Sequence, residues 1–335
     1  MDHRLGQPAA VTAAGARPRR RWLRPALEYS IVAAFAGFLG WALVSQWSQV
    51  RTVLTDLSPM AVAAAAGAGL AGIWASFLVW RSVLAALGHR PPVTGGMRIF
   101  FVGQAGKYVP GAVWPVLAQI RLGRRYQLPD RVSATAAIIF MLVVLGTGLL
   151  VAVATVPLFA PGAYADYWWL LPALPAVAVL LWPPLLNRLL PWLLHRLRQQ
   201  PLPAPLSPAG MIRAAGWALV MWTGYGLHLW LLLASLAGPT GATLPLRALG
   251  AFAAAWCVGF LLVVAPAGAG PREVALVVLL AGAVEAPAAL VAALVSRLLL
   301  TAGDLAWPAV ALAVTSRTGA GTTAEDSPRI HQGDV

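Results

Sequence analysis

The sequence is poor in charge, in lysine and in cysteine. Charged residues make up 10% of its 335 residues, whereas a soluble domain carries about 25%. The single cysteine, Cys257, excludes an intramolecular disulfide and a metal site built from cysteines. Enzyme signatures are missing too: there is no Gly-x-x-x-x-Gly-Lys-Ser/Thr, no His-Glu-x-x-His and no Gly-x-Ser-x-Gly. We therefore expect no soluble enzyme, no catalytic residues, and neither a cofactor nor a metal.

The chain contains several long apolar runs. Hydrophobic residues make up 59% of the chain, and its mean hydropathy is +0.75. Runs of roughly 20 or more largely apolar residues are long enough to cross the hydrocarbon core as helices. Six such runs begin near Ala26, Leu57, Ser133, Tyr167, Ala214 and Ala288. The sequence predicts an all-α, polytopic helical membrane protein with about six full spans.

The positive charges are distributed unevenly between the loops. The net charge is +13, yet alternate loops hold only Arg51 and Arg247, whereas the other loops and the residues beside both termini are rich in arginine. This positive-inside pattern predicts a multi-pass membrane protein with both termini cytoplasmic. Residues 1–25 form a basic cytoplasmic segment, which is either a solvated face or a contact for anionic lipid head groups. Residues 318–335 are polar and Gly-rich, which is typical of a disordered tail. With charges placed in this way, we expect no nucleic-acid partner.

Two apolar stretches are each interrupted by proline and glycine with charge beside them. The first break reads GKYVPG, from Gly106 to Gly111, and the second reads APAGAGPRE, from Ala265 to Glu273. They occupy corresponding places in two units, 60–158 and 214–314, of a transmembrane domain that covers 26–317. The charge map makes the first break enter from the cytoplasm and the second from outside. This predicts an inverted repeat whose two re-entrant hairpins meet near mid-membrane, where transporters bind substrate.

The charges at the breaks suggest phosphate recognition. Lys107 is the only lysine in the chain, and an ammonium binds phosphate as a compact point charge; the simpler interpretation is a snorkelling lysine. Arg272 and Glu273 open the helix after the second break, where free N–H groups attract an anion. Arg272 would clamp a phosphate, and Glu273 would cap the turn or balance Arg272. The alternative is a structural ion pair that closes the hairpin.

Further polar residues lie inside the apolar runs. Arg297, Thr301 and Asp304 fall on one helical face, at i, i+4 and i+7, and intramembrane charges must face the bundle or a wet cavity. A local pair between Arg297 and Asp304 is possible, but seven residues is a long separation, which favours a partner on another helix. His228 is better explained as a packed or hydrogen-bonded histidine than as a proton relay. Glu285 is typical of a solvated acid at a helix start.

The two breaks resemble the motifs of the lysylphosphatidylglycerol synthase transmembrane family. QAGKYVPGAVWP, from Gln104 to Pro115, is similar to its "GKY-PG-VW" signature, and the segment from Pro266 to Leu276 is similar to its "PGG-G-RE-A" segment. Ala267 stands where a glycine is usual, and Pro271 precedes the Arg-Glu pair. The resemblance and the residue chemistry together give the predicted substrate-binding residues: Lys107, Tyr108, Pro110, Gly111, Trp114, Gly268, Gly270, Arg272, Glu273, Arg297 and Asp304.

The resemblance implies lipid movement. In two-domain members the membrane part resembles a flippase for aminoacylated phospholipid, and a soluble domain performs aminoacyl transfer; we expect this synthase activity to be absent. The leading hypothesis is a flippase of the bacterial inner membrane that moves an anionic or modified (glyco)phospholipid, or a polyprenyl-linked lipid, between leaflets. One alternative is a non-catalytic membrane partner of a lipid-modifying enzyme. An intramembrane transferase that uses Asp304 or Glu273 as base is a further alternative, which the shortage of carboxylates disfavours.

Overall fold

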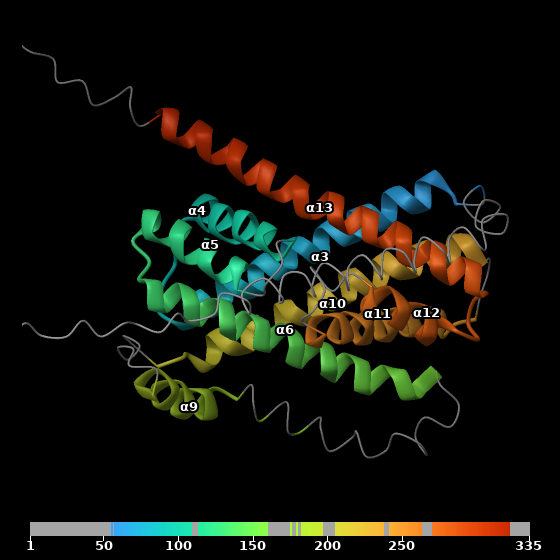
Figure 1. The fold of residues 1–335 in the computed structure, drawn as a ribbon, viewed down its shortest axis with the longest axis horizontal. Helices are drawn as coiled ribbons and strands as arrows, with labels where there is room; N and C mark the ends of the chain where they lie inside the picture. The colour runs from blue at the N-terminus through green and yellow to red at the C-terminus, as the bar shows by residue number, and fades with distance from the viewer. Residues whose placement is uncertain are drawn as a thin grey trace, which may run out of the picture.

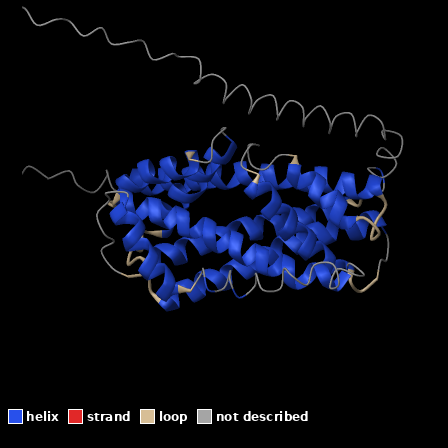
Figure 2. Cartoon of the chain, turned by 60° about the horizontal axis from the view of Figure 1, so that its bottom comes forward, coloured by secondary structure: helices blue, strands red, loops and turns tan. Residues whose placement is uncertain are grey.

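The computed structural model describes residues 57–108, 113–159, 182–196, 205–237, 241–262 and 270–321, with positions 55, 175 and 179. Figure 2 shows that this part of the chain is helical, with loops and turns between the helices and no strand. The first predicted span and most of the fourth lie outside these residues. The helices are α3 (Pro59–Ala86), α4 (Val93–Met97), α5 (Trp114–Gly123), α6 (Asp130–Phe159), α9 (Pro183–Arg196), α10 (Pro208–Ala237), α11 (Leu244–Leu261), α12 (Pro271–Leu280) and α13 (Ala286–Gly321).

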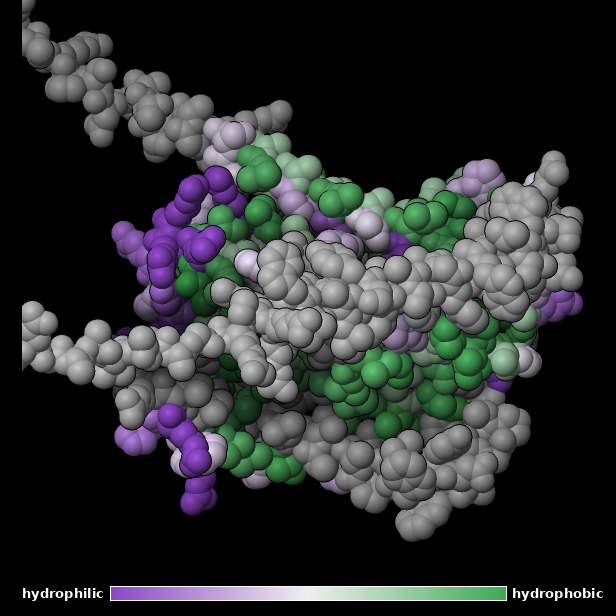
Figure 3. Space-filling model, viewed as in Figure 1, coloured by the Kyte–Doolittle hydropathy of each residue, from purple (hydrophilic) through white to green (hydrophobic). Residues whose placement is uncertain are grey.

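Five of the described helices are long and apolar enough to cross a membrane, namely α3, α6, α10, α11 and α13. Four of them coincide with predicted spans, which confirms a multi-pass helical membrane protein. The fifth, α11, lies in the segment predicted as one limb of the second hairpin. At 18 residues it would extend about 27 Å, which is close to the thickness of a hydrocarbon core. Figure 3 shows hydrophobic side chains along the bundle and hydrophilic ones gathered at the end where α4, α5 and α9 lie.

The centre of the fold is an antiparallel pair of helices, α3 and α10. At one end the Ser58 N–H donates to the Ser235 hydroxyl at 3.0 Å, and at the other the Ser207 N–H donates to the Ala86 carbonyl at 3.0 Å. Between these ends the two backbones come close, because a Cβ placed on Gly224 would lie 3.1 Å from the Cα of Gly72. Small residues at such crossings allow the close packing that joins helices in membranes.

An aromatic cluster attaches the first break to this pair. A short π-helix, η2 (Arg98–Val102), follows α4 and brings Phe100 and Phe101 against α3. Phe101 also stacks on Trp307 of α13, with 5.2 Å between ring centroids. On the other side, the Trp80 indole N–H donates to the side-chain oxygen of Gln119 in α5 at 3.0 Å. These contacts fix the 3₁₀ turn η3 (Ala105–Tyr108) beside α13.

Helix α12, which begins within the second break, lies toward the opposite end of the bundle. Figure 1 places α4 and α5 toward one end of the molecule and α12 toward the other. Helix α11 packs on α6, α10 and α12, and α12 packs on α13. Helix α13 therefore contacts both broken segments, because η3 touches it as well.

Candidate functional site

Asp304 joins the first break to α13. The Lys107 ammonium lies 2.7 Å from Oδ2 of Asp304, and the Tyr108 hydroxyl donates a 2.7 Å hydrogen bond to the same oxygen. Lys107 keeps 34% of its side chain exposed, whereas Asp304 keeps 16%. The acid is thus enclosed by two adjacent residues of the break, and the ammonium remains within reach of a ligand.

Glu273 joins the second break to α13. Its Oε1 lies 3.4 Å from the Arg297 guanidinium, and its Oε2 accepts a hydrogen bond from the Gly270 N–H. Gly270 has a φ of 104°, a left-handed conformation that a residue with a side chain rarely adopts. One buried carboxylate therefore caps α12 and forms the ion pair to α13.

Arg272 packs on an aromatic ring. Its guanidinium stacks over the ring of Phe252 in α11, 4.6 Å from the centroid, in a cation–π contact. Of the two sequence expectations for Glu273, the cap is confirmed. Its ion pair is with Arg297, and its negative charge also interacts electrostatically with Arg272. The cation of Arg272 is therefore stabilised by the aromatic face of Phe252.

The two ion pairs lie deep within the longest helix. The candidate span in α13 runs from Ala286 to Ser316. At 1.5 Å per residue, Arg297 is about 16 Å from its start and Asp304 about 18 Å from its end. Both charges are thus near the middle of the span. Their partners come from other segments, as the spacing of Arg297 and Asp304 predicts.

His228 lies inside the bundle and bridges three helices. Its Nδ1 lies 2.8 Å from the Ala65 carbonyl of α3, and its Nε2 lies 2.9 Å from the Ser296 hydroxyl of α13. A carbonyl only accepts, so Nδ1 carries the proton, and a neutral ring then accepts from the serine at Nε2. The packed, hydrogen-bonded histidine expected from the sequence is confirmed. Its bond to Ser296 positions the residue that directly precedes Arg297 in α13.

Most of the predicted site residues belong to the two broken segments and α13, and the structure places these segments in contact. Trp114 begins α5 with its side chain 45% exposed. Its backbone packs on Gly106, where a Cβ would lie 3.0 Å from the Trp114 carbonyl carbon. Pro110, Gly111 and Gly268 lie outside the described residues. Sequence reasoning missed Phe252 and Ser296, and neither stands out, since an aromatic and a serine are ordinary residues in an apolar helix.

No group of three or more His, Cys, Asp or Glu within the described ranges is arranged to hold a metal ion. The described site consists of three cations and two carboxylates on helices that meet inside a membrane bundle. No curated protein matches the chain. The family model described as the lysylphosphatidylglycerol synthase TM region matches residues 27–307, which include both breaks and the charged part of α13. The chain therefore belongs to the lysylphosphatidylglycerol synthase transmembrane family.

Proposed function

We propose that this protein is a lipid transporter of the flippase type, which moves a lipid with an anionic head group between the leaflets of the bacterial inner membrane. The observation that carries the proposal is the attachment of both broken segments to α13 through charged side chains, by Lys107 to Asp304 and by Glu273 to Arg297. Charge at membrane depth is costly and marks a substrate or ion pathway.

The charge balance of the site favours an anion. Lys107, Arg272 and Arg297 contribute three positive charges, and Glu273 and Asp304 contribute two negative ones. One positive charge is left in excess, which a single phosphodiester would neutralise. The acyl or prenyl chains of such a lipid would remain in the surrounding hydrocarbon while the head group enters the site.

The arrangement around Asp304 allows an exchange of partners. Lys107 and Tyr108 both contact Oδ2 of this carboxylate. When a phosphate draws the ammonium away, the tyrosine hydroxyl still satisfies the acid. Lys107 is the more exposed member of its pair, so it is the cation that an arriving head group would meet first. The cost of opening the pair is thereby reduced.

The arrangement of the helices supports alternating access. Helices α3 and α10 run antiparallel, and the broken segments approach α13 from opposite ends of the bundle (Figure 1). Both features are expected of two units with inverted topology, in which two re-entrant segments meet near the midplane. Rocking of one unit against the other would expose the charged site to one leaflet and then to the other.

The test is a translocation assay in proteoliposomes with fluorescent anionic, aminoacylated and polyprenyl-phosphate lipids. We expect movement of one class, lost in Lys107→Gln and Asp304→Asn. The matched control is Asp130→Asn, which breaks an exposed bidentate pair with Arg124 outside the site and should leave transport unchanged.

Two outcomes would contradict the proposal. Normal transport by Lys107→Gln and Arg272→Gln would place the head group elsewhere. No movement of any lipid class by folded wild-type protein would favour a role as partner of a lipid-modifying enzyme.

A further inference from the structure

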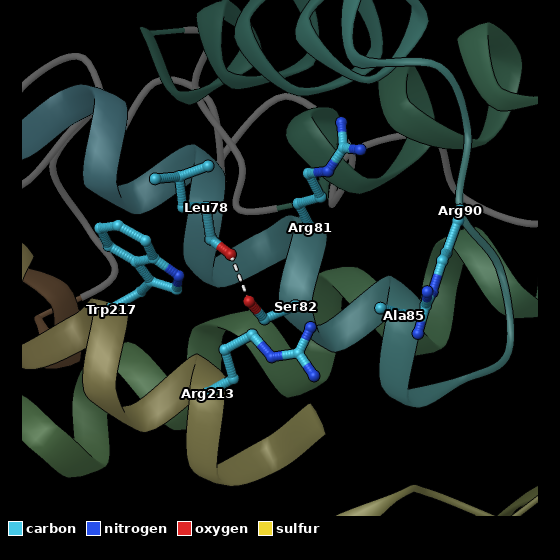
Figure 4. Close-up of a pocket in the computed structure, with 7 residues that line it drawn as sticks. All are labelled: Leu78, Arg81, Ser82, Ala85, Arg90, Arg213 and Trp217. Carbon is cyan, nitrogen blue, oxygen red and sulfur yellow. Dashed lines mark hydrogen bonds between the residues drawn. The ribbon is translucent and has the colours of Figure 1, made fainter. Parts of the chain in front are cut away.

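A second cationic site lies at the end of the bundle where α3 ends and α10 begins. A cavity of about 220 Å³ there is lined by Arg81, Arg90 and Arg213, by Ser82, and by apolar side chains that include Trp217. In Figure 4 the guanidinium of Arg213 points toward Ser82 and that of Arg90 toward Ala85, while Arg81 extends away from Arg213. All three arginines thus line one small cavity, and the guanidinium groups of Arg90 and Arg213 point toward its other lining residues.

No carboxylate among the described residues balances these arginines. Of the four acids described, Asp130 pairs with Arg124, Asp304 with Lys107 and Glu273 with Arg297. The fourth, Glu285, immediately precedes α13 in the sequence. In addition, one nitrogen of Arg81, Nη1, is buried with no hydrogen-bond partner. Arg90 and Arg213 are exposed, and with no counter-charge from the described part of the chain their positive charges favour the binding of an anion.

The walls of the cavity indicate a lipid as the source of that anion. Arg213, Trp217 and Val220 fall at i, i+4 and i+7 on one face of α10, and Val220 is 51% exposed. A charged residue is thus followed by an indole and then by an exposed apolar side chain, in the direction of the membrane interior. This is the order in which the phosphate, the glycerol region and the acyl chain of a phospholipid follow each other.

The size of the cavity limits what enters it. Pockets for drug-sized ligands measure about 300–1,000 Å³, so 220 Å³ suits a head group whose chains stay outside. Ser82 donates to the Leu78 carbonyl at 2.7 Å, which leaves its oxygen lone pairs as acceptors for a glycerol hydroxyl. Arginine is the preferred partner for the phosphate, because its fork of N–H groups matches two phosphate oxygens.

We propose that this cavity binds the phosphodiester head group of an anionic phospholipid, with Arg90 and Arg213 as its phosphate ligands. The lipid would come from the cytoplasmic leaflet, which lies next to the arginine-rich loops. The site is separate from the charges on α13 and does not depend on the transport function. A bound lipid would hold the ends of α3 and α10 together, and it would therefore stabilise the folded protein.

The experiment uses the full-length protein in detergent, titrated with short-chain phosphatidylglycerol. Native mass spectrometry counts the retained lipid, and thermal unfolding reports stabilisation. We expect one equivalent to bind at this cavity, in addition to any lipid at the transport site, and to raise the Tm of the wild type. Each of Arg90→Gln and Arg213→Gln should weaken this binding about tenfold, since each removes charge-assisted hydrogen bonds.

The controls separate the pocket from general surface charge and from the transport site. Arg121→Gln removes an exposed arginine of α5 that does not line the cavity and should bind as the wild type does. Lys107→Gln should keep the equivalent that Arg90→Gln and Arg213→Gln lose, so loss of transport and loss of this binding are distinguishable. Arg213→Lys keeps the charge and should retain part of the affinity, which guards against a folding defect in the glutamine variant.

Three results would overturn the proposal. Unchanged binding by the Arg90→Gln/Arg213→Gln double variant would show that these arginines are not the ligands. Equal binding of phosphatidylcholine would show that the site does not select net negative charge. Binding of inorganic phosphate or glycerophosphate as tight as that of the lipid would make a free phosphate, and not a lipid, the natural ligand.

Discussion

The Tyr108 hydroxyl donates a 2.7 Å hydrogen bond to Asp304, which lies 196 positions later in the chain. The neighbouring Lys107 places its ammonium on the same carboxylate oxygen. An unpaired charge is expensive at membrane depth, so each of these groups stabilises the other. The negative charge of Asp304 in α13 is thus neutralised by the first break. The positive charge of Arg297 in α13 is likewise neutralised by Glu273 of the second break.

The first prediction concerns this pair. Lys107→Gln and Asp304→Asn should each lower the Tm in detergent, because each leaves the remaining charge of the pair without its counter-charge. The double variant should be more stable than the sum of the single effects predicts, by about 1 kcal/mol, a modest value because Lys107 is one-third exposed. A double-mutant cycle from thermal unfolding measures this coupling. Strictly additive effects would show that the pair contributes nothing.

The second prediction separates the two roles of Glu273. Glu273→Gln keeps an oxygen that accepts from the Gly270 N–H and loses the charge opposite Arg297, whereas Glu273→Leu loses both. The leucine variant should therefore be about 1 kcal/mol less stable than the glutamine variant, the usual value of a helix cap. Thermal unfolding compares them. Equal stability would mean that the cap is unimportant, and normal transport by both variants would remove Glu273 from the site.

The third prediction tests the bridge made by His228. His228→Leu fills similar space but removes the hydrogen bonds to the Ala65 carbonyl and the Ser296 hydroxyl. We expect a loss of about 1–3 kcal/mol in stability, the cost of buried polar groups without partners. Ser296→Ala, which removes one of the two bonds, should cost less. A leucine variant as stable as the wild type would contradict a bridging role.

The fourth prediction tests the packing of the first break. A Cβ on Gly106 would lie 2.9 Å from the Pro115 backbone nitrogen, so Gly106→Ala must push η3 away from α5. Transport should fall, because the shift displaces the adjacent Lys107. The matched control is Gly67→Ala in α3, where nothing lies within 4 Å of the added carbon and where alanine favours helix. Transport in proteoliposomes is measured for both variants. Equal transport by Gly106→Ala and Gly67→Ala would contradict the prediction.

The fifth prediction concerns topology. Cys257 is the only cysteine and is buried, so a Cys257→Ala background allows single cysteines to be labelled. Arg125→Cys, after α5, should react with a membrane-impermeant maleimide only once cells are opened. Gly241→Cys, between α10 and α11, should react in intact cells, since the charge distribution places this loop outside. Labelling of both from the same side would contradict the predicted orientation.

The sequence located the helices because their signal is local. Each of α3, α6, α10 and α13 is a long, largely apolar run, and such a run has only one low-energy form in lipid, a helix. The status of α11 was harder to predict. Its apolar run continues directly into the second break, and composition does not separate the limb of a hairpin from a span of 18 residues.

The sequence by itself determined which residues carry unusual chemistry. Lys107, Glu273, Arg297 and Asp304 stand out because charge in an apolar run is expensive and needs a reason. Only the tertiary structure decided their partners. Neighbours in sequence, such as Arg272 and Glu273, point in different directions from a helix start. The pairing depends on how α12 and η3 pack on α13, through contacts such as Phe101 on Trp307, and no local pattern encodes such long-range contacts.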